Sequence, residues 1–265
     1  PIDLPLFLSP TALQRLFHHE GERAVGRSAE AFNTLFGISS LATVGIEEIA
    51  ETIRTPKIFQ LYYHRDKALT WSMIDRCLDS GFDALALTVD TIVGGNRERD
   101  LWTGFTSPPK LTPSSLLSFA THPSWTLNYL LREPFQLSNL KDHVAEGSNI
   151  SISVSDYFSS MLDQSMDWDA AAEVRRRWGK AFCLKGIMSV EDAQRAVDIG
   201  ADAIMVSNHG GRQLDGSRAP FDQLAEIVDA VGDQIDVICD GGIQRGTHVL
   251  NCLLYTSDAA DDSLR

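Results

Sequence analysis

Apolar residues recur along the chain in short runs, separated by longer segments of helical periodicity. Such runs are typical of strands buried on both faces, and the segments between them are typical of the helices that cover these strands. Repeated alternation of strand and helix predicts a parallel sheet, and seven units exceed what one half of a doubly wound sheet supplies. The pattern therefore favours an α/β fold, a (β/α)8 TIM barrel with about seven of its eight strand-helix units present. The expected strands span residues 5–9, 34–39, 57–62, 84–89, 181–185, 203–207 and 235–239.

Two helix starts are marked by their polar residues. Ser189 precedes Glu191 and Asp192, which is the pattern of an N-cap followed by acidic residues in the first turn, and Gly200 marks the end of that helix. Residues 45–49 open a shorter helix. Both helices follow expected strands, as a barrel requires.

The stretch from about 90 to 168 is longer than an ordinary strand-to-helix loop and is expected to be an insertion. Aromatic and apolar residues alternate with prolines along it. An active-site lid, a subunit contact and a membrane-surface patch all fit this composition. The membrane alternative places a peripheral contact at residues 100–140.

Both ends of the chain differ from those expected of a complete barrel. The sequence starts at Pro1 without an initiating methionine, and residues 252–261 resemble the translation of a sequencing-library adapter. We therefore expect an incomplete barrel domain at 1–251 and a non-native tail at 252–265, with an ordinary acidic tail as the alternative. A native N-terminal segment and the eighth unit would then be missing.

Composition and charge narrow the classes of function. The chain has 265 residues, of which 43% are hydrophobic, and a mean hydropathy of −0.10, which suits one large buried core. A net charge of −13 argues against a nucleic-acid surface, because phosphate binding needs clustered Lys and Arg. The four cysteines show neither CxxC pairs nor metal-ligand spacing, and we interpret them as reduced thiols. Since no export signal or long apolar run is visible, we expect a cytoplasmic protein.

The most informative segment is Val-Ser-Asn-His-Gly-Gly-Arg-Gln-Leu-Asp-Gly at 206–216. It sets His209 three positions before Arg212, directly after the apolar run 203–206. Active sites of strand-helix barrels lie at the C-terminal ends of the strands, so both side chains are expected there. A base beside a permanent cation suits removal of a proton from a bound carboxylic acid. The alternative is a histidine that caps or fills a turn.

These eleven residues resemble the active-site motif of the FMN-dependent 2-hydroxy-acid dehydrogenases and oxidases. The surrounding sequence is most similar to the bacterial flavin-type L-lactate dehydrogenases, and the resemblance covers residues 1 to about 251. It implies a barrel, bound FMN and oxidation of a 2-hydroxy acid. Because no GxGxxG motif follows a strand, a nicotinamide cofactor is disfavoured.

The resemblance implies roles for the polar residues at the strand ends. His209 would be the base, and Asp90 would stabilise the imidazolium that forms. Arg212 would clamp the substrate carboxylate with two hydrogen bonds. Arg97 would add positive potential near the developing charge, and Tyr62 would hydrogen-bond the reacting hydroxyl.

A lysine at the end of a buried strand, Lys185, would stabilise the charge of the reduced flavin. Residues 240–246 are similar to the first part of the family's phosphate site, where glycine N–H groups meet a phosphate at a helix start. The cofactor contacts implied by the resemblance are Pro10, Thr11, Ala12, Ser39, Gln60, Thr88, Lys185, Ser207, Asp240, Gly241, Gly242 and Arg245.

Leu41 occupies the pocket position where glycolate oxidase-like members carry tryptophan, so the substrate is expected to be L-lactate, oxidised to pyruvate. Glycolate, mandelate or a longer acid stay open, because a few methylenes change binding by only about 1–3 kcal/mol. The electron acceptor is either a quinone of the respiratory chain or oxygen. The intact protein is expected to be a homo-oligomer, cytoplasmic or peripheral on the inner membrane. Two rival interpretations are an FMN barrel with different chemistry and an inactive, flavin-free fragment.

Overall fold

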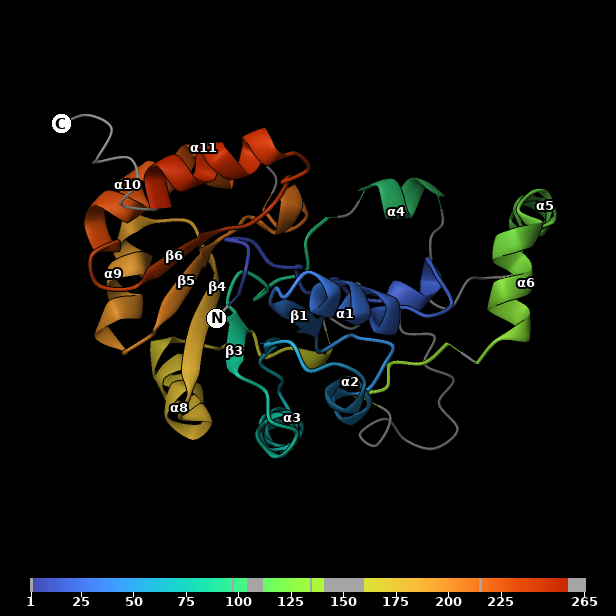
Figure 1. The fold of residues 1–265 in the computed structure, drawn as a ribbon, viewed down its shortest axis with the longest axis horizontal. Coiled ribbons are helices and arrows are strands. Elements are labelled where there is room, and N and C mark those ends of the chain that lie inside the picture. Colours follow the sequence, from blue (N-terminus) through green and yellow to red (C-terminus); the bar gives the residue numbers. More distant parts are fainter. Residues whose placement is uncertain are drawn as a thin grey trace. The chain divides into compact units, whose positions relative to one another are not determined.

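A computed structural model describes residues 2–96, 98–103, 112–133, 135–140, 160–214 and 216–256. The chain forms two compact units, which are described separately. The first comprises residues 1–83 and 97–161, and the second comprises residues 84–96 and 162–265. Parallel strands connected by helices occur in both, which is the predicted α/β class (Figure 1).

The first unit contains a parallel pair of strands, β1 (Phe36–Ser39) and β2 (Lys57–Leu61). Every residue of both strands is buried, as the apolar runs predict. Phe59 packs edge-to-face on Phe82, with the ring centroids 6.0 Å apart. The other elements before the insertion are the 3₁₀ turn η1 (Gln14–Leu16) and the helices α1 (Glu22–Ala31), α2 (Ile46–Thr52) and α3 (Lys67–Asp79).

The expected strand at 5–9 is reduced to an isolated bridge. Leu8 pairs with Phe36, donating to Leu35 O and accepting from Gly37 N. Pro10 follows two residues later and has no N–H to extend the pairing. The prediction of a regular strand at 5–9 was therefore wrong, although the segment does lie against β1.

The second unit contains four consecutive parallel strands, in which β3 pairs with β4, β4 with β5, and β5 with β6. Across the two units, six expected strands are present with bounds within two residues of the prediction. The strands of the second unit are β3 (Ala84–Thr88), β4 (Ala181–Ile187), β5 (Ala203–Val206) and β6 (Asp236–Cys239).

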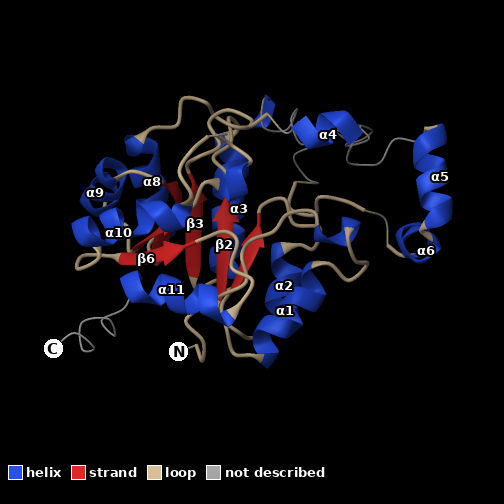
Figure 2. Cartoon of the chain, turned by 90° about the horizontal axis from the view of Figure 1, so that it is seen from above, coloured by secondary structure: helices blue, strands red, loops and turns tan. Residues whose placement is uncertain are grey.

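Helices pack against these strands, and α9 and α10 lie side by side (Figure 2). Ser189 caps α9 by accepting a hydrogen bond from Asp192 N at 3.1 Å, and Gly200 takes a φ of +76° after its end, as predicted. The helices of this unit are α8 (Trp168–Trp178), α9 (Val190–Asp198), α10 (Pro220–Val231) and α11 (Gly246–Thr256).

The insertion contains helices where it is described. These are α4 (Glu98–Thr103), α5 (Pro113–Thr121) and α6 (Pro123–Leu131). Thr112 and Ser115 form a capping box at the start of α5, and prolines occupy the first turns of α5 and α6. None of the helices in the described residues is both long and apolar enough to cross a membrane.

The predicted non-native tail at 252–265 stays a prediction. Its first five residues complete α11, and residues 257–265 lie outside the described part of the chain. Residue 256 closes the last turn of that helix.

Candidate active site

The strand ends of the second unit bring four predicted cofactor residues to the same edge of its sheet. Thr88 is in register with Lys185 across β3 and β4, and Ser207 directly follows β5. Asp240 follows β6, and its backbone N–H donates to Val206 O at 3.0 Å. Parallel strands place their carboxyl ends together, so the sequence pattern alone predicts this grouping.

Lys185, Ser207 and Asp240 form a closed polar triangle. The Lys185 ammonium donates to Ser207 Oγ and to Asp240 Oδ2, both at 2.9 Å, and Ser207 Oγ donates to Asp240 Oδ2 at 2.7 Å. The Lys185 side chain is only 7% exposed, so its charge is held mainly by this carboxylate and hydroxyl. The cation that the resemblance assigns to the flavin site is therefore buried and paired, and its position beside a flavin stays a prediction.

Asp90 and His209 form the second predicted grouping. His209 Nδ1 lies 3.1 Å from both carboxylate oxygens of Asp90, and the two side chains are 19% and 14% exposed. A nitrogen that faces a carboxylate carries the proton, which leaves Nε2 with the lone pair in the neutral ring. The pair thus has the geometry of a base oriented by a carboxylate.

The turn that carries His209 has an unusual backbone. His209, Gly210 and Gly211 have φ values of +58°, +67° and +70°, all in the left-handed region. A non-glycine residue adopts this region at a cost, so surrounding bonds must hold it. Ser207 Oγ accepts from His209 N at 3.2 Å, and Asn208 Oδ1 accepts from Gly211 N at 3.0 Å.

A second set of contacts, which sequence reasoning missed, holds the loop that carries Asp90. The Gln213 side-chain amide donates to Asp90 O at 3.2 Å and to Val93 O at 3.0 Å. Gly95 passes so close to Arg212 that an added Cβ would lie 2.0 Å from Arg212 O. Gln213 lies inside the motif at 206–216, and this position is the signal from which its role could have been predicted.

Gly186 is another positioning residue that sequence reasoning missed. It has a φ of +106° and lies at a shift of register between β4 and β5. A Cβ at this position would lie 2.7 Å from both Cβ and Cγ of Asp90. Because Gly186, next to Lys185, has no side chain, there is room for the Asp90 carboxylate that orients His209.

In the first unit, the predicted residues meet around the end of β1. Ser39 Oγ donates to Gln60 Oε1 at 3.0 Å and accepts from Leu41 N at 3.2 Å. Pro10 lies against β1, since a Cβ on Gly37 would come within 2.9 Å of the Pro10 nitrogen.

Tyr62 follows β2 and is buried, as are Ser39, Gln60 and Leu41. Thr11 and Ala12 continue the segment from Pro10, and Gln14 Nε2 donates to Thr11 O at 3.1 Å.

Some predicted groupings stay predictions. Arg97 lies outside the described residues, and Arg212 is exposed beside the His209 turn. The convergence of Tyr62 and Leu41 with His209 is likewise untested, because they belong to different units.

Comparison with known proteins decides the family. The profile of the FMN-dependent dehydrogenases matches residues 1–259. The chain belongs to the FMN-dependent dehydrogenase family. The resemblance inferred from the motif at 206–216 is thereby confirmed.

Relatives of this family member act on different 2-hydroxy acids. It is 38% identical to the L-lactate oxidase of Nostoc sp., over 98% of this chain and 66% of that protein. It is 36% identical to the glycolate oxidase of Spinacia oleracea, over 95% of this chain and 62% of that protein. The crystal structure of the monotopic membrane protein (S)-mandelate dehydrogenase matches with a TM-score of 0.88 and 32% identity, over 97% of this chain and 68% of that one. The chain therefore spans less than two thirds of the length of the two sequence relatives.

The residues present fit FMN, the cofactor of the family. Lys185 supplies a buried cation in the second unit, and Ser39 and Gln60 supply buried polar groups in the first. Gly241 and Gly242 have positive φ and open space where a Cβ would stand, so a ligand can approach their backbone. Arg245 directly precedes α11, and the positive end of a helix at its first turn suits a phosphate.

Proposed function

We propose that this protein oxidises an L-2-hydroxy acid to the 2-oxo acid with FMN, and that the acid is L-lactate. The observation that carries the proposal is the Asp90–His209 pair, in which Nδ1 faces the carboxylate at 3.1 Å. The family membership and the buried Lys185 support the flavin part of it.

Each residue would have a defined task in this reaction. Arg212, with Arg97, would bind the substrate carboxylate, and Tyr62 would hydrogen-bond the hydroxyl. His209 would take a proton from the substrate at Nε2, and Asp90 would stabilise the resulting imidazolium by charge. FMN, when bound, accepts the two electrons that the substrate loses. Lys185 would place its positive charge beside the cofactor, with Ser207 and Asp240 fixing the ammonium.

The choice of L-lactate rests on Leu41, which is buried at the end of β1. A leucine leaves more room for a substrate side chain than the tryptophan of glycolate oxidase-like members. Relatives that act on lactate, glycolate and mandelate are all similar to this chain, so the side chain of the substrate is the property to test.

Anaerobic bleaching of bound flavin tests both parts of the proposal. After FMN loading, L-lactate should bleach the flavin faster than glycolate or (S)-mandelate by roughly 10- to 200-fold, the range that pocket fit provides. D-lactate is the control. If Arg212 and His209 hold the substrate in one fixed orientation, this enantiomer should bleach the flavin little. Faster bleaching by mandelate or glycolate would show that this acid, and not L-lactate, is the substrate. FMN binding without bleaching by any of these acids would refute the proposed reaction.

We further propose a peripheral contact with the inner membrane, on its cytoplasmic side, through α5 and α6. Leu116 and Leu117 on α5 are 53% and 68% exposed, and Leu130 and Leu131 on α6 are 68% and 75% exposed. Exposed apolar side chains grouped on adjoining helices favour a lipid surface. The similar (S)-mandelate dehydrogenase is a monotopic membrane protein, which supports the location. Assembly into a homo-oligomer stays a prediction.

Flotation with phospholipid vesicles checks this contact. The unmodified protein should float with the vesicles, and the double variant Leu130→Ser, Leu131→Ser should remain largely in the soluble fraction. Leu250→Ser is the matched control, because Leu250 is 64% exposed on α11. Equal flotation of the double variant and the unmodified protein would contradict the proposed surface.

A further inference from the structure

A buried carboxylate on α1 holds the loop that follows β1, within the first unit. Glu22 is fully buried and belongs to the first turn of α1, where the helix dipole stabilises a negative charge. Its Oε1 accepts a hydrogen bond from Thr43 N at 2.9 Å, and its Oε2 accepts one from Thr43 Oγ1 at 2.6 Å. Both carboxylate oxygens thus bind one residue, which fixes the orientation of Thr43 as well as its position. We call this pair of bonds the Glu22–Thr43 clamp.

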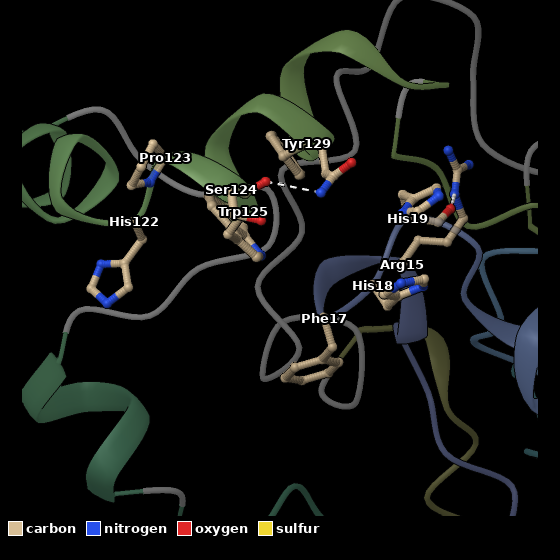
Figure 3. A pocket seen from close by; sticks show the side chains of 10 residues that line it. Arg15, Phe17, His18, His19, His122, Pro123, Ser124, Trp125 and Tyr129 are labelled. Carbon is tan, nitrogen blue, oxygen red and sulfur yellow. Dashed lines mark hydrogen bonds between the residues drawn. The ribbon is translucent and has the colours of Figure 1, made fainter.

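Two other segments of the chain also hold Thr43. Its Oγ1 accepts from Arg15 N at 3.3 Å, and its carbonyl oxygen accepts from Ser138 Oγ at 2.7 Å. The Arg15 side chain lines a cavity beside α6 together with His18 and His19 (Figure 3), whereas the Arg15 backbone contacts Thr43. Every polar atom of Thr43 is therefore hydrogen-bonded. Such a residue can be displaced only by breaking these bonds in a buried place, where lost bonds are costly.

Leu41 lies two residues before Thr43 in the same loop. Its N–H donates to Ser39 Oγ at 3.2 Å, and its carbonyl oxygen accepts from Leu13 N at 3.2 Å. Ala42 N donates to Ser39 O at 2.9 Å, which closes a tight turn between β1 and Thr43. Because β1 fixes one end of this turn and the clamp fixes the other, the bonds to Thr43 also restrict the Leu41 backbone.

We propose that Glu22 and Thr43 are positioning residues that hold Leu41 and thereby set which substrate side chain is accepted. This inference rests on the proposed function, which assigns Leu41 to the side chain of the acid. Pocket fit discriminates only where the pocket wall keeps its place, because a wall that moves admits side chains of different sizes alike. Loss of the clamp should therefore change the choice of acid more than the rate with the preferred acid.

Hydrogen exchange measures the clamp without flavin or substrate. Glu22→Met keeps a side chain of similar length and removes both acceptors, which leaves the buried Thr43 N–H without a partner. The cost of such a group corresponds to about 5- to 150-fold faster exchange of the amides at 41–43. Glu22→Gln should restore slow exchange, because its carbonyl can accept from Thr43 N and its amide can donate to Thr43 Oγ1.

A second variant and a matched control complete this measurement. Thr43→Val loses the hydroxyl but keeps the branched shape, so its exchange should be faster than that of the unmodified chain and slower than that of Glu22→Met. It decides the outcome if circular dichroism shows that Glu22→Met does not fold. Glu30→Met is the control, because Glu30 lies on the same helix and accepts from Arg54 N at 2.9 Å but is exposed. It should leave exchange at 41–43 unchanged.

Anaerobic bleaching of the FMN-loaded chain measures the choice of acid. Among L-lactate, glycolate and (S)-mandelate, the preferred acid should lead by roughly 10- to 200-fold in the unmodified chain and by less than about 10-fold in Glu22→Met. Glu22→Gln and Glu30→Met should keep the preference of the unmodified chain.

Two outcomes would overturn the inference: unchanged exchange in both Glu22→Met and Thr43→Val, or faster exchange with an unchanged preference among the acids. If the unmodified chain is bleached by none of the acids, the proposed function fails instead. The exchange measurement needs no reaction, so failure of the clamp and failure of the proposed function are distinguishable.

Discussion

Replacing His209 with asparagine should slow anaerobic flavin reduction by the 2-hydroxy acid by about 10²- to 10⁴-fold, the usual contribution of a positioned base. Asparagine tolerates the left-handed backbone that His209 adopts at φ +58°, so the turn should persist while the imidazole is lost. Bound flavin, read from its absorbance spectrum, should be unchanged. Stopped-flow bleaching measures the rate.

Chemical rescue makes this result specific. His209→Gly suits the same backbone and leaves room for a small base, so added imidazole should restore part of the rate. Asp90→Asn should also slow the reaction strongly, because a neutral amide cannot stabilise an imidazolium 3.1 Å away. If His209→Asn reduces flavin at the unmodified rate, His209 is a structural turn residue and the assigned mechanism fails.

Replacing Gly186 with alanine should lower both stability and the rate of flavin reduction. The new Cβ would stand 2.7 Å from Cβ and Cγ of Asp90, at a backbone φ of +106° that side chains rarely adopt. Strain of this kind costs about 1–3 kcal/mol, and the clash can be relieved only by moving Asp90 away from its place opposite His209. Urea unfolding measures the first effect and anaerobic bleaching the second.

Gly200→Ala provides the matched control. Gly200 also has a positive φ, +76°, but a Cβ there would meet nothing within 4 Å. It should lower the free energy of unfolding and leave the rate of bleaching unchanged. Equal rates for Gly186→Ala and Gly200→Ala would show that the closeness of Gly186 to Asp90 has no part in the reaction.

The positions of residues that lie at the end of a single strand could be predicted from the sequence. Lys185 and Asp240 each follow a short apolar run, and parallel strands with this order bring such residues to one edge. Contacts between distant loops could not be predicted in this way. The bond from Gln213 to Asp90 O joins residues 123 positions apart, and no periodicity in either loop encodes it. The room that Gly186 on β4 leaves for Asp90, which follows β3, depends on how these two strands are aligned.

The segment at 5–9 shows that an apolar pattern can also predict a regular strand that does not form. Its apolar pattern is that of a strand, and Leu8 does pair with Phe36, but Pro10 cannot continue the ladder. The insertion shows a third limit, because its prolines indicate breaks between helices without indicating which faces meet. The hydrogen bond from the Trp125 indole N–H to Leu16 O follows from tertiary packing, because it joins residues 109 positions apart.

The hydroxyl of Ser207 receives hydrogen bonds from both the Lys185 ammonium and the His209 backbone N–H. A single oxygen atom thus joins the lysine that is proposed to lie beside the cofactor to the turn that carries His209, the proposed base. Any ligand that shifts the Lys185 ammonium must change the free energy of that turn, and thermodynamic linkage makes the effect reciprocal. Affinity for the acid and affinity for the cofactor would therefore be mutually dependent, with occupation of either site favouring or opposing occupation of the other by the same factor.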